Sequence, residues 1–194
     1  MNKKTNKQLV SGGIFIFVLI LLDQITKHLA VLHLKNKPAI PIIKDVFELQ
    51  YLENTSAAFG MDPIKLLHNI FHFSIFESNP QLYLNVRMGF FYLLTILIVI
   101  LLCYVYKKIP NTKRYLFMDY ILLFFIAGAI GNLIDRITNQ YVIDFLYFKL
   151  IDFPIFNVAD IYVTCAAFSM IGLGLFYYKD EDVEAIFPSK KKNA

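Results

Sequence analysis

The sequence predicts an all-α membrane protein with four transmembrane helices. Of its 194 residues, 57% are hydrophobic and 16% aromatic, and the mean hydropathy is +0.54. A water-soluble domain of this size cannot hide so much apolar surface. Four segments also approach the roughly 20 apolar residues that cross about 30 Å of hydrocarbon. We therefore expect residues 1–194 to form one polytopic membrane domain, with spans at about 9–32, 88–106, 115–134 and 158–178 and outer loops at about 33–87 and 135–157.

The distribution of Lys and Arg predicts that both termini face the cytoplasm. The N-terminal tail, residues 107–114 and residues 179–194 carry 11 of these cations in about 32 residues, against 7 in the 78 residues of the outer loops. Cytoplasmic loops carry such an excess. The net charge of +4 reflects the same bias and contact with anionic membrane lipids. We expect no nucleic-acid partner, because no recognition motif is present.

The outer loops are expected to add a small β-cradle and an interfacial helix. Residues 47–51 alternate apolar and polar side chains, which indicates a strand. Residues 141–148 are also β-prone and are expected to pair with that strand over the bundle. After Pro63, apolar residues up to Ile75 recur at helical spacing, which is typical of an amphipathic helix lying on a membrane.

The first span carries two charges. Only about 14 residues, Leu9 to Leu22, are uninterrupted, which is about 21 Å of helix, so Asp23 must lie in or near the membrane. Lys27 follows one helical turn later, where the two charges compensate each other. Pairing of this kind and direct contact with a substrate are equally compatible with the sequence.

The third span ends in a polar cluster. Asn132, Asp135 and Arg136 share one helix face, and Gly128 and Gly131 permit close helix packing. The simpler interpretation of the two charged residues is an ordinary helix end, at which Arg136 reaches toward the membrane surface and Asp135 pairs with it.

Two further aspartates lie next to apolar segments. Asp144 stands in the apolar run of residues 142–148, and a lone carboxylate there needs a partner. Asp160 follows Asn157 by three residues, which resembles a helix capping box. Asp152, beside Phe153 and Pro154, is more typical of a turn. Because ionised groups in or beside hydrocarbon are expensive, Asp144 and Asp160 together suggest a catalytic pair.

Other kinds of catalytic site find less support. His68 and His72 have the spacing of two metal ligands on a helix, but Asn69 stands where a zinc peptidase has Glu, and no third ligand is evident. No nucleophile-elbow pattern surrounds Ser56. We therefore expect neither a metal nor another cofactor.

Five short motifs, in order, resemble the lipoprotein signal peptidases, the signal peptidase II family. They are DQITK at residues 23–27, NTSAAF at 54–59, GNLIDR at 131–136, VIDF at 142–145 and FNVAD at 156–160. Any one alone is weak, but five ordered matches over nearly the whole chain are specific.

The resemblance implies an intramembrane aspartic endopeptidase of the bacterial cytoplasmic (inner) membrane, with its site near the extracytoplasmic face. It would cleave diacylated prolipoproteins just before the lipid-modified cysteine, and globomycin-type inhibitors would block it. We expect it to act as a monomer. Matched by motif, Asp144 and Asp160 correspond to the catalytic dyad. The polar positions around the dyad and substrate correspond to Asp23, Lys27, Asn54, Asn132, Arg136 and Asn157, with Asp135 in support.

Two departures from the family pattern stand out. Ser56 occupies a position that is usually Gly, which would cost strain if the backbone there needs a positive φ. Residues 61–81 are longer and more apolar than is usual, which would alter how this loop covers a substrate.

Two other functions remain as alternatives. A small transporter or proton-pathway protein would use intramembrane polar residues such as Asp23, Lys27, Asn132 and Asp135. The second span offers almost no polar residues, and the polar positions gather toward one side, which argues against a pathway across the bundle. A noncatalytic membrane scaffold would tolerate replacement of both Asp144 and Asp160.

Overall fold

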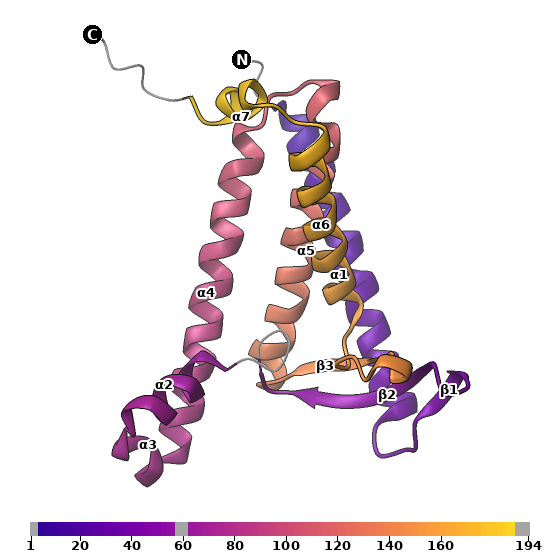
Figure 1. The fold of residues 1–194 in the computed structure, drawn as a ribbon, viewed down its shortest axis with the longest axis vertical. Helices are drawn as coiled ribbons and strands as arrows, with labels where there is room; N and C mark the ends of the chain where they lie inside the picture. Colours follow the sequence, from indigo (N-terminus) through magenta and orange to yellow (C-terminus); the bar gives the residue numbers. More distant parts are fainter. Residues whose placement is uncertain (1–3, 57–61, 189–194) are drawn as a thin grey trace. The chain divides into compact units, whose positions relative to one another are not determined.

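Four long helices dominate the protein (Figure 1). The computed structural model describes residues 4–56 and 62–188. The helices are α1 (Asn6–Leu34), α4 (Pro80–Lys108), α5 (Leu116–Asn139) and α6 (Val158–Phe176). Each is long and apolar enough to cross a membrane, α5 together with the 3₁₀ turn η2 (Lys113–Tyr115) before it. The predicted fold class is therefore confirmed, although α4 begins at Pro80 rather than at Met88.

The surfaces of these helices suit lipid better than water. Phe17 in α1, Leu97 in α4 and Phe168 and Leu175 in α6 each expose more than half of their surface. Large apolar side chains exposed in this number would favour aggregation in water. In a bilayer these side chains contact hydrocarbon tails, so their exposure carries no free-energy penalty.

A small antiparallel sheet joins the two long loops. Its strands are β1 (Ile40–Ile43), β2 (Phe47–Asn54) and β3 (Val142–Tyr147), in the order β1-β2-β3. The predicted pairing of β2 with β3 is confirmed, and it runs from Glu48 opposite Tyr147 to Asn54 opposite Val142. The sequence pattern does not predict β1. This strand contains Pro41, which an edge strand tolerates because it lacks a neighbour on one side.

The predicted interfacial helix is two short helices. Helix α2 (Pro63–Phe71) begins at the cap residue Asp62, whose carboxylate accepts a 3.0 Å hydrogen bond from the Lys65 amide. It ends because His72 adopts a left-handed conformation with φ of 47°. Helix α3 (Ser74–Ser78) follows. Exposed Leu66, Ile70 and Phe71 keep the apolar character expected of an element at a membrane surface.

The chain divides into two compact units. The first contains Met1–Leu22, Ile98–Ile130 and Val158–Ala194, and the second contains Asp23–Leu97 and Gly131–Asn157. Helices α1, α4 and α5 therefore contribute residues to both, whereas α6 belongs to the first unit and the sheet to the second. The second unit also contains the 3₁₀ turn η3 (Lys149–Ile151), which ends at a left-handed Asp152 and so confirms the predicted turn.

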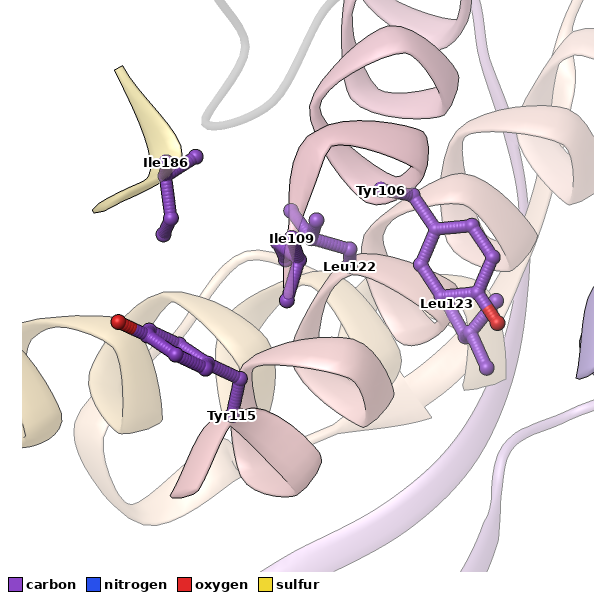
Figure 2. Packing of buried hydrophobic residues seen from close by; sticks show 6 residues of the cluster. All are labelled: Tyr106, Ile109, Tyr115, Leu122, Leu123 and Ile186. Carbon is purple, nitrogen blue, oxygen red and sulfur yellow. The ribbon is translucent and has the colours of Figure 1, made fainter. Parts of the chain in front are cut away.

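The first unit has a buried apolar cluster that includes the C-terminal helix (Figure 2). Its side chains are Tyr106, Ile109, Tyr115, Leu122, Leu123 and Ile186. Ile186 belongs to helix α7 (Asp180–Ile186), and Ile109, at the end of α4, is fully buried. Burial of Ile186 in this cluster attaches α7 to the ends of α4 and α5, since a buried side chain of this size stabilises its element by about 1.5–3 kcal/mol.

An ion pair also attaches α7. Arg114 points two nitrogens at Asp182, with Nε 2.5 Å from Oδ1 and Nη2 2.5 Å from Oδ2. The same Nη2 donates to the Tyr177 carbonyl, 3.0 Å away. Asp182 also accepts a hydrogen bond from the Lys179 amide at the start of α7. The Arg114 guanidinium and then this amide hold the pKa of the Asp182 carboxyl well below its usual range.

Gly128 allows the close helix packing that the sequence predicted, and its partner is α6. A Cβ at this position would lie 2.6 Å from the Ala159 carbonyl oxygen and 2.7 Å from Val163 Cγ2. The first of these atoms is backbone, so it cannot rotate away. Only glycine therefore permits this helix contact without moving α6.

We predict that Gly128→Ala lowers the free energy of unfolding by about 1–3 kcal/mol, because the added methyl group overpacks the α5–α6 contact. Thermal unfolding in detergent measures the effect. Gly172→Ala in α6 is the matched control, because a Cβ there meets no atom within 4 Å. It should leave stability unchanged or raise it slightly. Equal melting temperatures for Gly128→Ala and wild type would contradict the close contact.

We also predict that α7 loosens at acidic pH. A carboxyl with a depressed folded-state pKa stabilises fully above its unfolded value of about 3.9, and the contribution is lost as pH falls toward the folded value. The protection of the α7 amides from hydrogen exchange, measured relative to an unfolded chain at the same pH, should therefore fall below about pH 4.

Asp182→Asn should exchange faster at neutral pH and lose this acid dependence, whereas Asp180→Asn, an exposed acid of the same turn, should behave as wild type. The same acid profile in Asp182→Asn as in wild type would show that another group loosens α7.

Candidate functional site

Asp144 lies in the middle of β3 and is almost fully buried. The four residues Val142 to Phe145 are all buried, so this end of β3 has no solvent-facing side. Two amides contact the carboxylate from different segments. Asn54 Nδ2 at the end of β2 donates to Oδ2 at 2.8 Å, and Asn157 Nδ2 donates to Oδ1 at 2.7 Å. Each oxygen thus accepts a hydrogen bond from an amide, which suits a carboxylate.

Backbone pairing brings Asn157 to Asp144. The chain after η3 folds back on β3, and Leu146 and Phe156 exchange hydrogen bonds of 2.8 and 3.0 Å. This bridge sets Asn157, the next residue, beside the strand. Asn157 is fully buried, and its amide nitrogen also lies 3.0 Å from Asn132 Oδ1. Helix α6 begins immediately after it, at Val158.

A buried lysine links the first and third spans. Lys27 Nζ lies 2.9 Å from Asp23 Oδ2 and 3.0 Å from Asp135 Oδ2, and it donates to Asn132 Oδ1 at 2.9 Å. The structure thus shows the pairing of Asp23 with Lys27, one of the two interpretations that the sequence left open. All three charged side chains expose 2% or less of their surface. One cation faces two carboxylates, and hydrogen bonds must satisfy the remaining negative charge.

Asp135 supports the strand that carries Asp144. Its Oδ2 accepts the Ile143 amide at 3.0 Å, and its Oδ1 accepts Gln24 Nε2 at 3.0 Å. The interpretation that Asp135 pairs with Arg136 at a plain helix end is wrong, because the carboxylate faces the bundle and pairs with Lys27. This arrangement fixes the backbone one residue before Asp144 to the buried charges.

Arg136 faces the end of β2. Its Nη2 donates to the Ser56 carbonyl at 3.2 Å, and its guanidinium carbon lies 5.2 Å from the centre of the Phe91 ring. The Tyr92 hydroxyl donates to the Arg136 carbonyl at 2.7 Å. Arg136 thus connects α4, α5 and the residues after β2.

The second unit brings together eight of the nine residues selected from the sequence. These are Asp23, Lys27, Asn54, Asn132, Asp135, Arg136, Asp144 and Asn157. Among residues 4–56 and 62–188, seven polar or charged residues are buried with their backbone included, and all seven belong to this unit. The concentration of polar groups in one unit does not favour the alternative of a proton or solute pathway.

Asp160, the ninth residue, lies in the first turn of α6, in the first unit. It is half-buried. It follows Asn157 by three residues in the chain. Asp160, the predicted partner of Asp144, therefore belongs to α6, which begins two residues after Phe156, the residue that pairs with β3.

The motif at residues 54–59 is described only through Ser56. Residues 57–59 and Met61 lie outside the described residues. Positive φ angles in the described non-glycine residues occur at Asn36, Asp45, His72, Gln140 and Asp152. Ser56 is not one of them, so serine at this position carries no left-handed backbone strain.

The sequence pattern does not predict the partners of the residues that follow β2. Next to the end of β2, the buried Arg87 of α4 contacts Asp62, the residue before α2, and the half-buried Tyr83 of α4 donates to the same carboxylate. The signal was available, because Arg87 immediately precedes the apolar stretch that predicted the second span. The sequence places Arg87 in the outer loop, where an arginine indicates no particular contact.

The fold and this buried polar group define a polytopic membrane protein whose carboxylates are held by amides and a lysine. A family model described as signal peptidase (SPase) II matches residues 15–176. The chain belongs to the signal peptidase II family, and so is a multi-pass bacterial membrane peptidase that cleaves signal peptides from lipoproteins.

Relatives named lipoprotein signal peptidase match most of the chain. The protein of Caldanaerobacter subterraneus is 36% identical over 84% of this chain and 94% of its own length. That of Brevibacillus brevis is 38% identical over 81% and 86%. A solved bacterial membrane enzyme structure, determined by the in meso method at 2.3 Å resolution, has a TM-score of 0.67 and 26% identity, and covers 100% of this chain and 99% of that one.

We predict that Lys27→Ala lowers the free energy of unfolding by about 3–5 kcal/mol, because it leaves two carboxylates buried without their cation. The melting temperature of the purified protein in detergent reports the loss. Lys35→Ala serves as the control, because its 2.8 Å pair with Glu53 is exposed and should change stability little. A melting temperature of Lys27→Ala close to that of wild type would show that the lysine does not hold the two spans together.

Proposed function

We propose that this protein is an aspartic endopeptidase that cleaves diacylated prolipoproteins just before the lipid-modified cysteine, with Asp144 and Asp160 as its catalytic dyad. One observation carries the proposal: Asp144 is buried with an amide donor on each carboxylate oxygen, within a group of polar side chains beside apolar helices. A buried carboxylate supported in this way needs a chemical reason.

The mechanism follows from two carboxylates sharing one proton. Like charges that are close together cannot both ionise easily in a low-dielectric site. The ionised aspartate would accept a proton from a water molecule as the water attacks the scissile carbonyl. The protonated aspartate would donate a hydrogen bond to the carbonyl oxygen and later give its proton to the departing amine. The cycle consumes one water and requires no metal or covalent intermediate.

The other polar residues have distinct roles in this proposal. Asn54 and Asn157 hold the Asp144 carboxylate through its two oxygens. Asn132 links Asn157 to the Lys27 charge group, since its Oδ1 accepts from both. Preorganised donors of this kind do not have to reorient as charge develops, which lowers the barrier.

The membrane supplies the rest of the substrate site. In this proposal residues 1–194 form one polytopic domain of the bacterial cytoplasmic membrane, with both termini in the cytoplasm, as the lysine and arginine distribution indicates. The sheet and helices α2 and α3 then lie at the extracytoplasmic face. The signal helix and diacylglyceryl chains of the substrate remain in lipid while an extended segment reaches the dyad. Globomycin-type inhibitors would compete for this site, and the enzyme would act as a monomer.

We predict that Asp144→Asn and Asp160→Asn each reduce cleavage by about 10²–10⁴-fold or more, because each removes either the base or the acid. The assay is gel-shift processing of a diacylated prolipoprotein by purified enzyme.

Asp152→Asn is the matched control. Asp152 is an exposed turn residue that accepts a 2.6 Å hydrogen bond from the Tyr147 hydroxyl, so its substitution should leave cleavage near the wild-type rate. Melting temperature and detergent extraction establish that each variant is folded. Folded Asp144→Asn and Asp160→Asn proteins that still cleave would overturn the dyad, and an inactive wild type would favour a noncatalytic scaffold.

A further inference from the structure

Arg87 connects both ends of the link between β2 and α2. It lies in the second turn of α4, and its side chain exposes only 9% of its surface. Its Nη2 donates to the carbonyl of Thr55, the residue after β2. Its Nε lies 3.1 Å from Oδ2 of Asp62, the cap residue of α2. One buried guanidinium therefore contacts the chain on either side of residues 57–61.

Asp62 is itself firmly held. Its Oδ1 caps α2 through the Lys65 amide, and its Oδ2 accepts the Tyr83 hydroxyl at 3.1 Å as well as facing Arg87. Tyr83 and Arg87 are one turn apart on α4. Tyr83 supplies a hydrogen bond to the Asp62 carboxylate, and Arg87 supplies the opposite charge. The Asp62 side chain exposes only 7% of its surface, so this ion pair is largely shielded from water.

The opposite end of the link leads to the active-site candidate. Arg87 contacts the Thr55 carbonyl, and Arg136 contacts the next carbonyl, that of Ser56. The Ser56 amide donates to Asn54 Oδ1 at 2.9 Å. Because the amide oxygen of Asn54 is used in this way, its Nδ2 is the atom turned toward Asp144. The backbone after β2 thus decides which end of the Asn54 amide meets the carboxylate.

We infer that Arg87 is a positioning residue for the proposed peptidase reaction. By holding Thr55 and Asp62 it sets the backbone that orients Asn54, and Asn54 sets the Asp144 carboxylate. This inference rests on the proposed function and adds to it a residue outside the polar positions that the family motifs predict. Its effect should appear in kcat, since Asn54 acts on the reacting group rather than on a remote part of the substrate.

The guanidinium has a property that lysine lacks. The arginine side chain ends in a planar, charged fork, so one rigid group donates to the Thr55 carbonyl and keeps its positive charge next to the Asp62 carboxylate. Lysine at this position keeps the charge opposite Asp62 but has no fixed second donor for Thr55. Arg87→Lys should therefore retain the fold and recover only part of the activity.

The test is a double-mutant cycle with kcat and KM measured on a diacylated prolipoprotein. Arg87→Ala should lower kcat by about ten- to a hundredfold, as expected for a misplaced catalytic group, with KM within about threefold of wild type. In an Asn54→Ala background the same substitution should cost less than about twofold, because Arg87 acts through Asn54. Hydrogen exchange of the Ser56 amide should accelerate in Arg87→Ala and less so in Arg87→Lys.

Lys4→Ala is the matched control for loss of a buried cation. Lys4 lies 2.6 Å from Asp119 in the first unit and exposes 2% of its side chain. This variant should melt earlier than wild type and keep its kcat.

Two kinetic results would overturn the inference. One is a full wild-type kcat in folded Arg87→Ala. The other is a double mutant in which the losses of kcat from Arg87→Ala and Asn54→Ala multiply. Unchanged exchange of the Ser56 amide would also overturn it, and this readout does not depend on cleavage. A wild type that does not cleave would count against the proposed function instead.

Discussion

The polar interior depends on one buried lysine. Lys27 faces the carboxylates of Asp23 and Asp135 and the amide oxygen of Asn132. Burying the lysine without the carboxylates, or the carboxylates without the lysine, would cost too much free energy, so α1 and α5 must keep the three charged groups together. Asp135 then fixes the Ile143 amide, and through it the strand that carries Asp144. The position of the candidate catalytic carboxylate thus follows from an electrostatic requirement of the membrane helices.

Amides carry this constraint to Asp144. The Asn132 oxygen accepts from both Lys27 and Asn157, and Asn157 donates to Asp144. On the opposite side, Asn54 donates to the second carboxylate oxygen. Amides suit this task because each has a donor and an acceptor on one rigid plane. Two amide side chains therefore fix the position of both carboxyl oxygens of Asp144.

The two units solve different physical problems. The first unit consists largely of apolar side chains, and α7 is attached to it by Ile186 and by the pair of Arg114 with Asp182. The second unit contains the sheet and, among the described residues, the polar residues that are buried with their backbone included. In lipid, apolar side chains gain little by leaving their solvent, so small residues such as Gly128 and polar contacts contribute most to helix association. Rigidity at the site therefore comes from hydrogen bonds and ion pairs.

The sequence by itself determined the class of fold, the strand in each outer loop and the turn at Asp152, and it offered the pairing of Asp23 with Lys27 as one of two interpretations. These features depend on composition and short-range periodicity, which are visible without coordinates. Only the tertiary structure decided that Asp135 pairs with Lys27 rather than with Arg136, that the predicted interfacial helix breaks at His72, and that Arg87 contacts Thr55 and Asp62. Each of these depends on which atoms meet across segments distant in sequence, or on one backbone angle that the surrounding packing selects. Side-chain types and spacing do not specify either.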